Sequence, residues 1–292
     1  MKILILGGTG SIGSAVTADL VAHQHQVIGL CRSEVSARKL SELGGQPWRG
    51  DLRAPSSWRA ALAGVDVVIQ LASTFGTDMA SVDAAAMACL RAEARVRPSN
   101  QPLRVIYTGG CWIYGETGDH AACETSPQRP IPAFSWMQVS ASLLLRDPNL
   151  SCAVVHPAMV YHEDGGGVFA RMLDQAAAGL PLEVWGSIHT RWPLVHRRDL
   201  ARAYRLLAEQ AQLTGHFNVA AQSGIPVRDI LAEILTRHPH DGAYLVRNRK
   251  YVMFKYGAWA EGPTLDQQMR AEKIRQSCGW QPEVADFTQA AF

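Results

Sequence analysis

The chain has 292 residues, 47% apolar and 18% charged side chains, and a formal net charge of +2. This length is sufficient for one large domain or two joined domains with a buried core. The composition is that of a soluble globular enzyme and excludes a disordered or fibrous chain, and the small net charge gives no indication of a nucleic-acid partner.

The six cysteines occur singly, without a CxxC pair. This pattern favours reduced thiols, no zinc site and a cytoplasmic location. The apolar run at residues 3–6 is too short for a signal peptide, and no later run is long enough to span a membrane. We therefore expect a cytoplasmic protein with no metal and no membrane partner.

A glycine-rich loop follows the first apolar run. KILIL (2–6) has the pattern of a buried parallel strand, and GGTGSIG comes directly after it, before an amphipathic helix expected over 11–23. Glycines spaced in this way permit a tight turn, a close approach of the backbone to a diphosphate, and close packing of the helix on the strand. The positive dipole end of the helix then faces the diphosphate. We predict a dinucleotide site formed by Gly7, Thr9, Gly10, Ser11, Ile12 and Gly13.

The residues after the second expected strand, QVIGL (26–30), bear on which dinucleotide binds. NAD sites place a carboxylate here for the adenosine ribose hydroxyls, whereas this chain has Arg32 and Ser33. An arginine at this place accommodates a 2′-phosphate; a surface arginine on a loop is the alternative. We expect NADP(H) as the preferred cofactor and NAD(H) as the other candidate.

The remaining chain continues to alternate strands with helices. Apolar runs predict strands at 45–52, 66–73, 103–110 and 151–157, and a long helix at 79–97. This order predicts an α/β fold, a doubly wound parallel Rossmann sheet with ligands at the carboxyl ends of its strands. We assign 1–162 and 190–222 to the NAD(P)-binding domain, and 163–189 and 223–292 to a smaller, mostly helical C-terminal substrate lobe.

Motifs along the whole chain resemble those of the extended short-chain dehydrogenase/reductases, the NAD(P)-dependent epimerase/dehydratase group. They are GGTGSIG, RGDL (49–52), LAS (71–73), YTGGCWIYG (107–115), HPAMVY (156–161), WPLVHRRDLARAY (192–204) and LDQQMRAEKIRQSCGWQP (265–282).

This resemblance implies further cofactor contacts. It implies that an aspartate and its neighbour lie at the adenine, that the end of the fourth strand and the fifth strand line the cofactor site, and that the segment after the sixth strand lies beside the nicotinamide. The residues concerned are Asp51, Leu52, Leu71, Ala72, Ser73, Thr108, Pro157 and Val160. The helix at 79–97 is where members of the family dimerise, so a homodimer is also expected.

The chain differs from the family at the residues expected to carry out the proton transfer. In the family a tyrosine exchanges a proton with the substrate, a lysine four residues later lowers the pKa of that tyrosine, and a serine or threonine orients the carbonyl. FSWMQVSASLLL places Trp136 and Ser140 where the tyrosine and lysine are expected, and Gly110 stands at the serine place. No lysine occurs between Lys39 and Lys250, so a shifted alignment does not restore the proton relay.

Two tyrosines are candidates to replace the relay. Tyr114 ends the fifth-strand motif and could act as an acid, with packing in the pocket wall as the alternative. Tyr161 follows the sixth strand and could reach a substrate.

The expected substrate pocket contains the three altered places and two further residues. Trp136 would form a flat apolar wall, which suits an aromatic or hydrophobic substrate better than a sugar. In family members that act on nucleotide sugars an arginine near Arg191 holds phosphate; a salt bridge is the alternative here. Cys111 is either a pocket thiol or a buried bystander. We place Gly110, Cys111, Trp136, Ser140 and Arg191 in this pocket.

Three functions are compatible with these features. The first is an NADP(H)-dependent oxidoreductase of a small, non-sugar carbonyl or alcohol substrate that lacks the usual Tyr-Lys relay. The second is a non-redox lyase, isomerase or cyclase on the same fold. The third is a binding protein that senses the NADP redox state.

Overall fold

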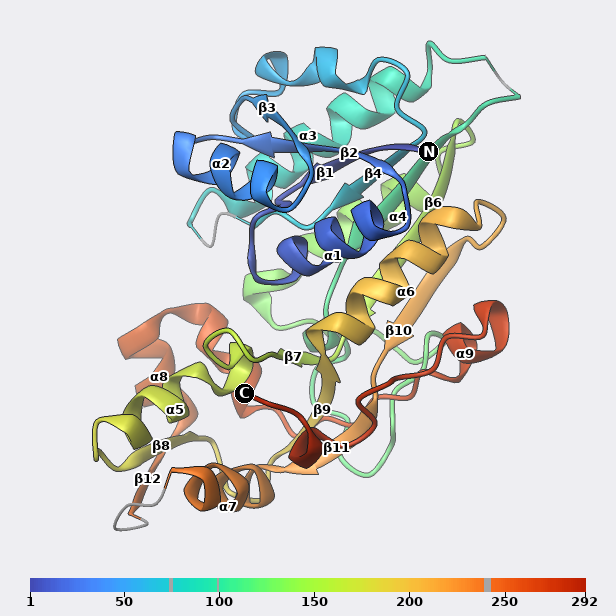
Figure 1. The fold of residues 1–292 in the computed structure, drawn as a ribbon. Helices are drawn as coiled ribbons and strands as arrows, with labels where there is room; N and C mark the ends of the chain where they lie inside the picture. Colours follow the sequence, from blue (N-terminus) through green and yellow to red (C-terminus); the bar gives the residue numbers. More distant parts are fainter. Residues whose placement is uncertain (74–75, 99, 239–242) are drawn as a thin grey trace. The chain divides into compact units, whose positions relative to one another are not determined.

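The computed structural model describes residues 1–73, 76–98, 100–238 and 243–292, which form two compact units (Figure 1). Unit 1 comprises Met1–Gly109, Trp136–Val155 and Leu200–Phe217; unit 2 comprises Gly110–Ser135, His156–Asp199 and Asn218–Phe292.

These units differ from the domains expected from the sequence, chiefly in the segment Gly110–Ser135. We had assigned this segment to the NAD(P)-binding domain, but its backbone bonds to the C-terminal part of the chain. The Ala122 N–H donates to the Gln268 carbonyl at 2.8 Å, and the Arg270 N–H donates to the Ala122 carbonyl at 2.9 Å. These bonds draw the segment into unit 2.

Unit 1 is built on a seven-stranded sheet with the order β10-β6-β5-β4-β1-β2-β3. All neighbours from β3 to β6 pair in parallel, which is the strand order of a dinucleotide-binding fold extended by β10. The doubly wound α/β fold predicted from the sequence is therefore confirmed. The strands are β1 (Lys2–Leu6), β2 (Gln26–Cys31), β3 (Gln46–Arg49), β4 (Val67–Gln70), β5 (Leu103–Thr108), β6 (Leu150–Pro157) and β10 (Gly215–Val219).

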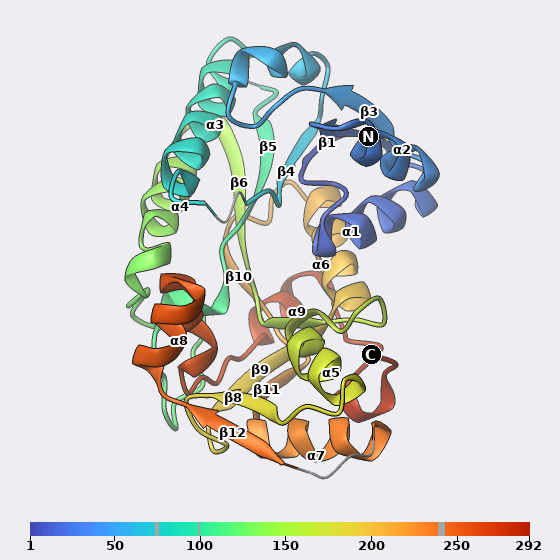
Figure 2. The ribbon, with the colours of Figure 1, turned by 90° about the vertical axis from the view of Figure 1, so that its left-hand side faces the viewer.

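Helices cover both faces of this sheet. Figure 2 shows α3 and α4 on one face and α1, α2 and α6 on the other. Because both faces are covered, the central strand β1 is buried: Ile3, Leu4, Ile5 and Leu6 are fully buried. The helices are α1 (Ser11–Ala22), α2 (Glu34–Glu42), α3 (Met79–Ala94), α4 (Trp136–Leu145) and α6 (Arg197–Glu209).

Three strands of unit 1, β3, β4 and β5, end earlier than the apolar runs predict. β3 stops at Arg49, and the Asp51 N–H then donates to the Ser57 hydroxyl at 3.0 Å instead of to a neighbouring strand. β4 stops at Gln70, whose side-chain amide bonds to both the N–H and the carbonyl of Ala72. Gly50 and Leu71 still donate to the Cys31 and Leu6 carbonyls of the neighbouring strands, and a side chain then accepts from the N–H of the following residue, Asp51 or Ala72.

Besides its helices, unit 2 contains two small sheets that the sequence did not predict. One has the order β11-β9-β7 and the other pairs β12 with β8 in parallel. The strands are β7 (Met159–Tyr161), β8 (Leu182–Trp185), β9 (Arg191–His196), β11 (Gln222–Pro226) and β12 (Tyr244–Arg247); the helices are α5 (Ala170–Ala177), α7 (Val227–Arg237), α8 (Arg249–Tyr256) and α9 (Glu272–Cys278). No helix in the described ranges combines the length and apolarity needed to cross a membrane.

Asp199 joins two sequence motifs within unit 2. Its carboxylate accepts hydrogen bonds from the backbone N–H groups of Glu283 at 2.7 Å and Val284 at 2.9 Å. Its carbonyl accepts one from the indole N–H of Trp280 at 2.9 Å. The aspartate of the VHRRDLA segment thus fixes the path of the chain after the GWQP segment.

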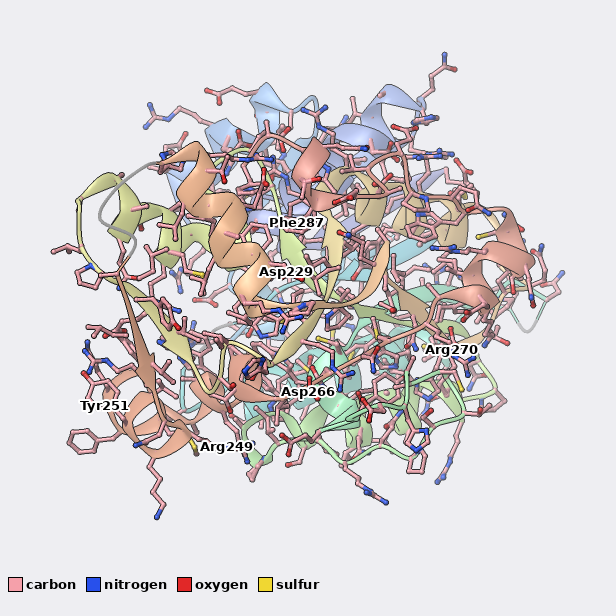
Figure 3. All side chains as sticks on the ribbon, turned by 90° about the horizontal axis from the view of Figure 1, so that it is seen from below. Asp229, Arg249, Tyr251, Asp266, Arg270 and Phe287 are labelled. Carbon is pink, nitrogen blue, oxygen red and sulfur yellow. The ribbon has the colours of Figure 1, made fainter. Side chains whose placement is uncertain are left out.

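Replacement of Asp199 by asparagine should lower the free energy of unfolding by about 1–3 kcal/mol. Both carboxylate oxygens accept from backbone N–H groups, so the amide nitrogen of Asn would face one of these donors. Denaturant unfolding of the full chain measures the change. Asp229→Asn is the matched control, because Asp229 lies on α7 in the same unit with a side chain that is 55% exposed (Figure 3). Equal effects of the two variants would contradict this role of Asp199.

Candidate functional site

The glycine loop of unit 1 joins β1 to α1, and among the described residues no side chain makes a capping hydrogen bond at the helix N-terminus. Gly10 is the N-cap residue of α1, and its N–H donates to the Gly7 carbonyl at 3.1 Å. Gly7 has a φ of +90°, and a Cβ there would lie 2.8 Å from the backbone nitrogen of Ala72. A Cβ on Gly13 would lie 2.0 Å from the Gly7 carbonyl oxygen. Glycine is therefore required at Gly7 and Gly13 by close backbone approach.

Gly10 serves a different purpose from the other two glycines. The nearest described atom to a Cβ at this position is the Gly7 carbonyl oxygen at 3.4 Å, so no clash demands glycine. Its effect is to leave open the space in front of the positive end of α1, where a diphosphate binds in such loops. Gly10 and Ser11 are exposed, and Thr9 and Ile12 are half-buried. These residues fit a dinucleotide.

Arg32 follows β2 directly and is exposed. Within the described part of the chain it has no hydrogen-bond or ion-pair partner. The Ser33 hydroxyl, in contrast, caps α2 by accepting a hydrogen bond from the Ser36 N–H at 3.1 Å. The first carboxylate after β2 is that of Glu34, which lies 3.8 Å from Arg49. Among the described residues, the end of β2 thus presents one unpaired cation, Arg32.

The other predicted cofactor residues follow the ends of neighbouring strands. The Asp51 carboxylate accepts from the Arg53 N–H at 2.9 Å, and Leu52 packs on the core of unit 1. After β4 the Leu71 N–H donates to the Leu6 carbonyl at 2.9 Å.

The remaining predicted cofactor residues divide between the two units. In unit 1 the Ser73 hydroxyl donates to the Met79 sulfur at 2.9 Å, and Thr108, the last residue of β5, shares a 2.7 Å hydrogen bond with the Tyr204 hydroxyl. Pro157 ends β6 and Val160 lies in β7.

Three residues stand where the family is expected to have its tyrosine, lysine and serine: Trp136, Ser140 and Gly110. Trp136 begins α4 and is half-buried. Ser140 on the same helix is only 5% exposed, and its hydroxyl donates to Asp83 Oδ2 at 2.6 Å. Gly110 has an extended backbone, and a Cβ there would meet no described atom within 4 Å. Ser140 is therefore engaged in the packing of α3 on α4, whereas Gly110 leaves room where the family has a serine.

The two candidate tyrosines are both buried in unit 2. The Tyr114 hydroxyl donates to Asn218 Oδ1 at 2.7 Å, and burial, followed by the nearby Glu124 carboxylate, raises the pKa of Tyr114. Tyr161 is fully buried against Phe169 at a ring distance of 5.3 Å, and burial raises its pKa as well. Its hydroxyl has no hydrogen-bond partner among the described residues. A raised pKa and a buried hydroxyl make both phenols poor proton donors near neutral pH.

Cys111 is a buried thiol whose pKa is raised to about 12 by burial. A thiol with such a pKa is protonated at neutral pH and unreactive, which agrees with the bystander alternative.

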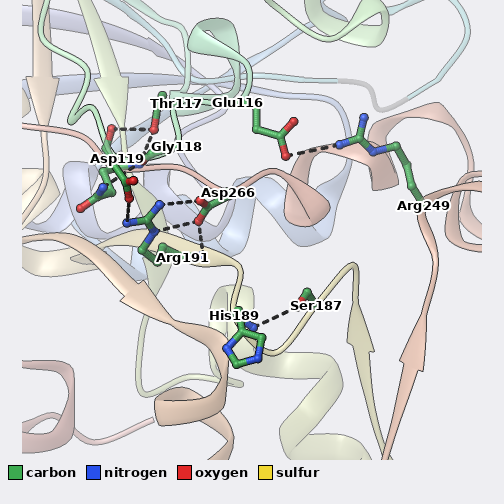
Figure 4. A network of polar contacts seen from close by, with 10 residues as sticks. Glu116, Thr117, Gly118, Asp119, Ser187, His189, Arg191, Arg249 and Asp266 are labelled. Carbon is green, nitrogen blue, oxygen red and sulfur yellow. Dashed lines mark hydrogen bonds and ion pairs between the residues drawn. The ribbon is translucent and has the colours of Figure 1, made fainter.

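Arg191 is engaged by two carboxylates of unit 2 (Figure 4). Its guanidinium donates to both oxygens of Asp266, at 2.9 and 2.5 Å, and to Asp119 at 2.9 Å. Hydrogen bonds from Arg191 lower the pKa of Asp266, and the two carboxylates raise the pKa of Arg191. The salt-bridge alternative therefore describes Arg191 better than a phosphate contact does.

Unit 1 contains a buried polar cluster that was not predicted from the sequence. It is formed by Gln70, Asp83, Tyr107 and Ser140, which are 2%, 4%, 1% and 5% exposed. Asp83 lies on the buried face of α3 among Val82, Ala86, Met87 and Leu90. A carboxylate on an otherwise apolar helix face is the one signal in the sequence that could have indicated it.

The sheet order and the glycine loop together define a Rossmann-type dinucleotide-binding protein. Residues 3–220 match the model of the NAD dependent epimerase/dehydratase family, and the chain belongs to this family. An uncharacterized protein of Schizosaccharomyces pombe is 28% identical over 302 residues, which cover 97% of this chain and 95% of that protein. A 2-alkyl-3-oxoalkanoate reductase of Stenotrophomonas maltophilia is 26% identical over 251 residues, or 80% of this chain and 75% of the reductase.

Solved structures share the fold at lower sequence identity. The UDP-glucose 4-epimerase of Thermus thermophilus, in complex with NAD, matches with a TM-score of 0.79 and 20% identity, covering 100% of this chain and 96% of that chain. The family match confirms the expected resemblance. Together with the reductase among the relatives, it supports an NAD(P)-dependent, oxidoreductase-type role in general terms.

The two buried tyrosines should respond differently to removal of the hydroxyl. Tyr114→Phe should lower the free energy of unfolding by about 1–3 kcal/mol, because it leaves Asn218 Oδ1 without this donor. Tyr161→Phe should stay within about 0.5 kcal/mol of the wild type or stabilise, because it removes a buried hydroxyl that has no partner. Thermal and denaturant unfolding of the matched pair measure both effects, and a larger loss for Tyr161→Phe would contradict this account.

The ion pair of Asp266 with Arg191 should make unit 2 sensitive to acid. The pKa of Asp266 is lowered in the folded chain, so its stabilisation is complete above about pH 5 and is lost as the pH falls below the ordinary aspartate value of about 3.9. The unfolding free energy of Asp266→Asn should therefore decline less between about pH 5 and pH 3 than that of the wild type. Parallel pH profiles would exclude the effect.

Proposed function

We propose that the chain is an NADP(H)-dependent reductase of a small, non-sugar carbonyl compound, working without the Tyr-Lys proton relay of its family. The observation that carries this proposal is the glycine loop together with Arg32 at the end of the next strand, an arginine without a partner in the described part of the chain. Gly10 leaves the N-terminus of α1 open, and Arg32 is exposed where NAD sites have a carboxylate.

The proposed cofactor preference depends mainly on Arg32. A 2′-phosphate at the end of β2 would accept hydrogen bonds from a guanidinium that has no competing partner among the described residues. Ser33 contributes less, because its hydroxyl is already used to cap α2. When bound, NADPH would supply a hydride to the carbonyl carbon.

The choice of a non-sugar carbonyl is supported by Arg191 and by one relative. The Arg191 guanidinium is taken up by Asp266 and Asp119, so it is poorly suited to hold the phosphate of a nucleotide sugar. The similar protein named as a 2-alkyl-3-oxoalkanoate reductase favours a ketone. Half-buried Trp136 suits an apolar part of such a substrate.

The proton that completes the reduction is proposed to come from water. Tyr114 and Ser140 use their hydroxyls in buried hydrogen bonds, and Cys111 holds its proton too tightly, with a pKa of about 12. The open space at Gly110 leaves room for a water molecule at the place of the family's serine.

The engagement of Tyr114 and Ser140 also favours a second candidate, a protein that binds NADP(H) without turnover and senses its redox state. Calorimetric titration of the full chain with NADPH, NADP⁺, NADH and NAD⁺ separates the two. Preference for both phosphorylated forms, followed by NADPH oxidation in a screen of ketones, supports the reductase. A large difference between NADPH and NADP⁺ without turnover supports the sensor, and binding of none of the four excludes both.

Arg32→Gln should weaken NADPH binding by about tenfold to a hundredfold, because it removes one charge-assisted hydrogen-bonded contact to the 2′-phosphate. NADH has no such phosphate, so its binding should stay within about twofold of the wild type. Calorimetry with both cofactors measures the two effects. Arg95→Gln is the matched control, since Arg95 is an exposed arginine of unit 1 at the far end of α3. Equal losses for NADPH and NADH would show that Arg32 does not contact the 2′-phosphate.

A further inference from the structure

The buried polar cluster of unit 1 reaches the glycine loop through a single side chain, that of Gln70. Gln70 is the last residue of β4 and is 2% exposed. Its Oε1 accepts a hydrogen bond from the Ala72 N–H at 3.1 Å, and its Nε2 donates to the Ala72 carbonyl at 3.2 Å. The amide therefore binds both polar groups of one backbone residue beyond the end of the strand.

Ala72 lies directly beside the glycine loop. Its backbone nitrogen and Cα are 2.8 and 2.9 Å from where a Cβ on Gly7 would stand. Because the backbones of Gly7 and Ala72 are in close contact, the position of Ala72 limits the position of the glycine loop. Gln70 thus holds Ala72, and the glycine loop that is proposed to bind the diphosphate packs against Ala72 at Gly7.

Asp83 determines which way the Gln70 amide points. Its Oδ1 accepts from Gln70 Nε2 at 3.2 Å, and a carboxylate can only accept. This fixes the nitrogen of the amide toward α3 and the oxygen toward the Ala72 N–H. Ser140 at 2.6 Å and Tyr107 at 3.1 Å donate to Oδ2 of Asp83 and hold the carboxylate in place between α3, α4 and β5.

Such a cluster is costly to bury unless each member is bonded. The Asp83 carboxylate is 4% exposed and therefore loses the water molecules that would hydrate it. Three neutral donors, those of Gln70, Ser140 and Tyr107, take the place of these water molecules. A purely structural contact between α3 and α4 would be served as well by apolar side chains. The cluster's particular property is that it orients a donor and an acceptor toward the backbone at Ala72.

We propose that Gln70, oriented by Asp83, is a positioning residue that holds the end of β4 against the glycine loop and thereby sets the affinity for the dinucleotide. This inference rests on the proposed function. Gln70 does not itself contact the cofactor; it acts through Ala72 and Gly7.

Calorimetric titration of the full chain with NADPH tests the proposal. Gln70→Leu introduces an apolar side chain of similar size and removes all three hydrogen bonds, so binding should weaken at least about tenfold, which corresponds to about 1.4 kcal/mol. Asp83→Asn should bind within about twofold of the wild type, because its amide oxygen can still face Gln70 while its nitrogen donates to the hydroxyl oxygens of Ser140 and Tyr107. Should Gln70→Leu not fold, Asp83→Ala tests the same anchor, with weakened binding expected.

Asp147→Ala is the control for a general loss of stability. Asp147 is also buried, at 6% exposed, and accepts from Arg91 of α3 at 2.7 Å, but it does not touch the end of β4. It should lose stability and retain NADPH affinity. If Gln70→Leu binds NADPH as tightly as Asp147→Ala, the positioning role is wrong although the proposed function stands. If the wild type binds no dinucleotide, the proposed function itself fails, and this inference with it.

Discussion

The close approach of the glycine loop to the end of β4 is the constraint on which unit 1 depends. At Gly7 and Gly13 there is no room for a Cβ, because backbone atoms stand 2.8 and 2.0 Å from its place. Close packing of this kind brings α1 down onto the sheet and points its N-terminus at the carboxyl ends of the strands. The sheet order, the apolar strands and the buried cluster around Asp83 all serve to hold these two segments together.

Three polar residues predicted to lie in the site are engaged in contacts within their own unit. Ser140 joins a buried network where a lysine is expected, and Tyr114 bonds to Asn218. Arg191 is surrounded by carboxylates. Tyr114 and Ser140 each use their single hydroxyl hydrogen within their own unit, and three of the five side-chain N–H groups of Arg191 donate to these carboxylates. Arg32 differs from them because it is exposed and unpaired within the described chain, and Gly110 differs because it leaves space.

Much of unit 1 could be predicted from the sequence, because its signals are local. A run such as KILIL followed by glycines and an amphipathic stretch specifies strand, turn and helix through neighbouring residues alone. The ends of β3 and β4 could not be predicted, since Ser57 and Gln70 terminate the ladder with side-chain hydrogen bonds. The small sheets of unit 2 were missed because a strand as short as Met159–Tyr161 has too few residues to show alternation.

By itself, the sequence determined the fold class, the glycine loop and the arginine after β2, and it predicts the loss of the Tyr-Lys relay. These depend on residue types at positions close together in the chain. Only the tertiary structure decided what Tyr114, Ser140 and Arg191 do, because their partners Asn218, Asp83 and Asp266 lie 57 to 104 residues away. The role of a polar side chain depends on its hydrogen-bond partners, and only folding brings together partners that are so distant in the sequence.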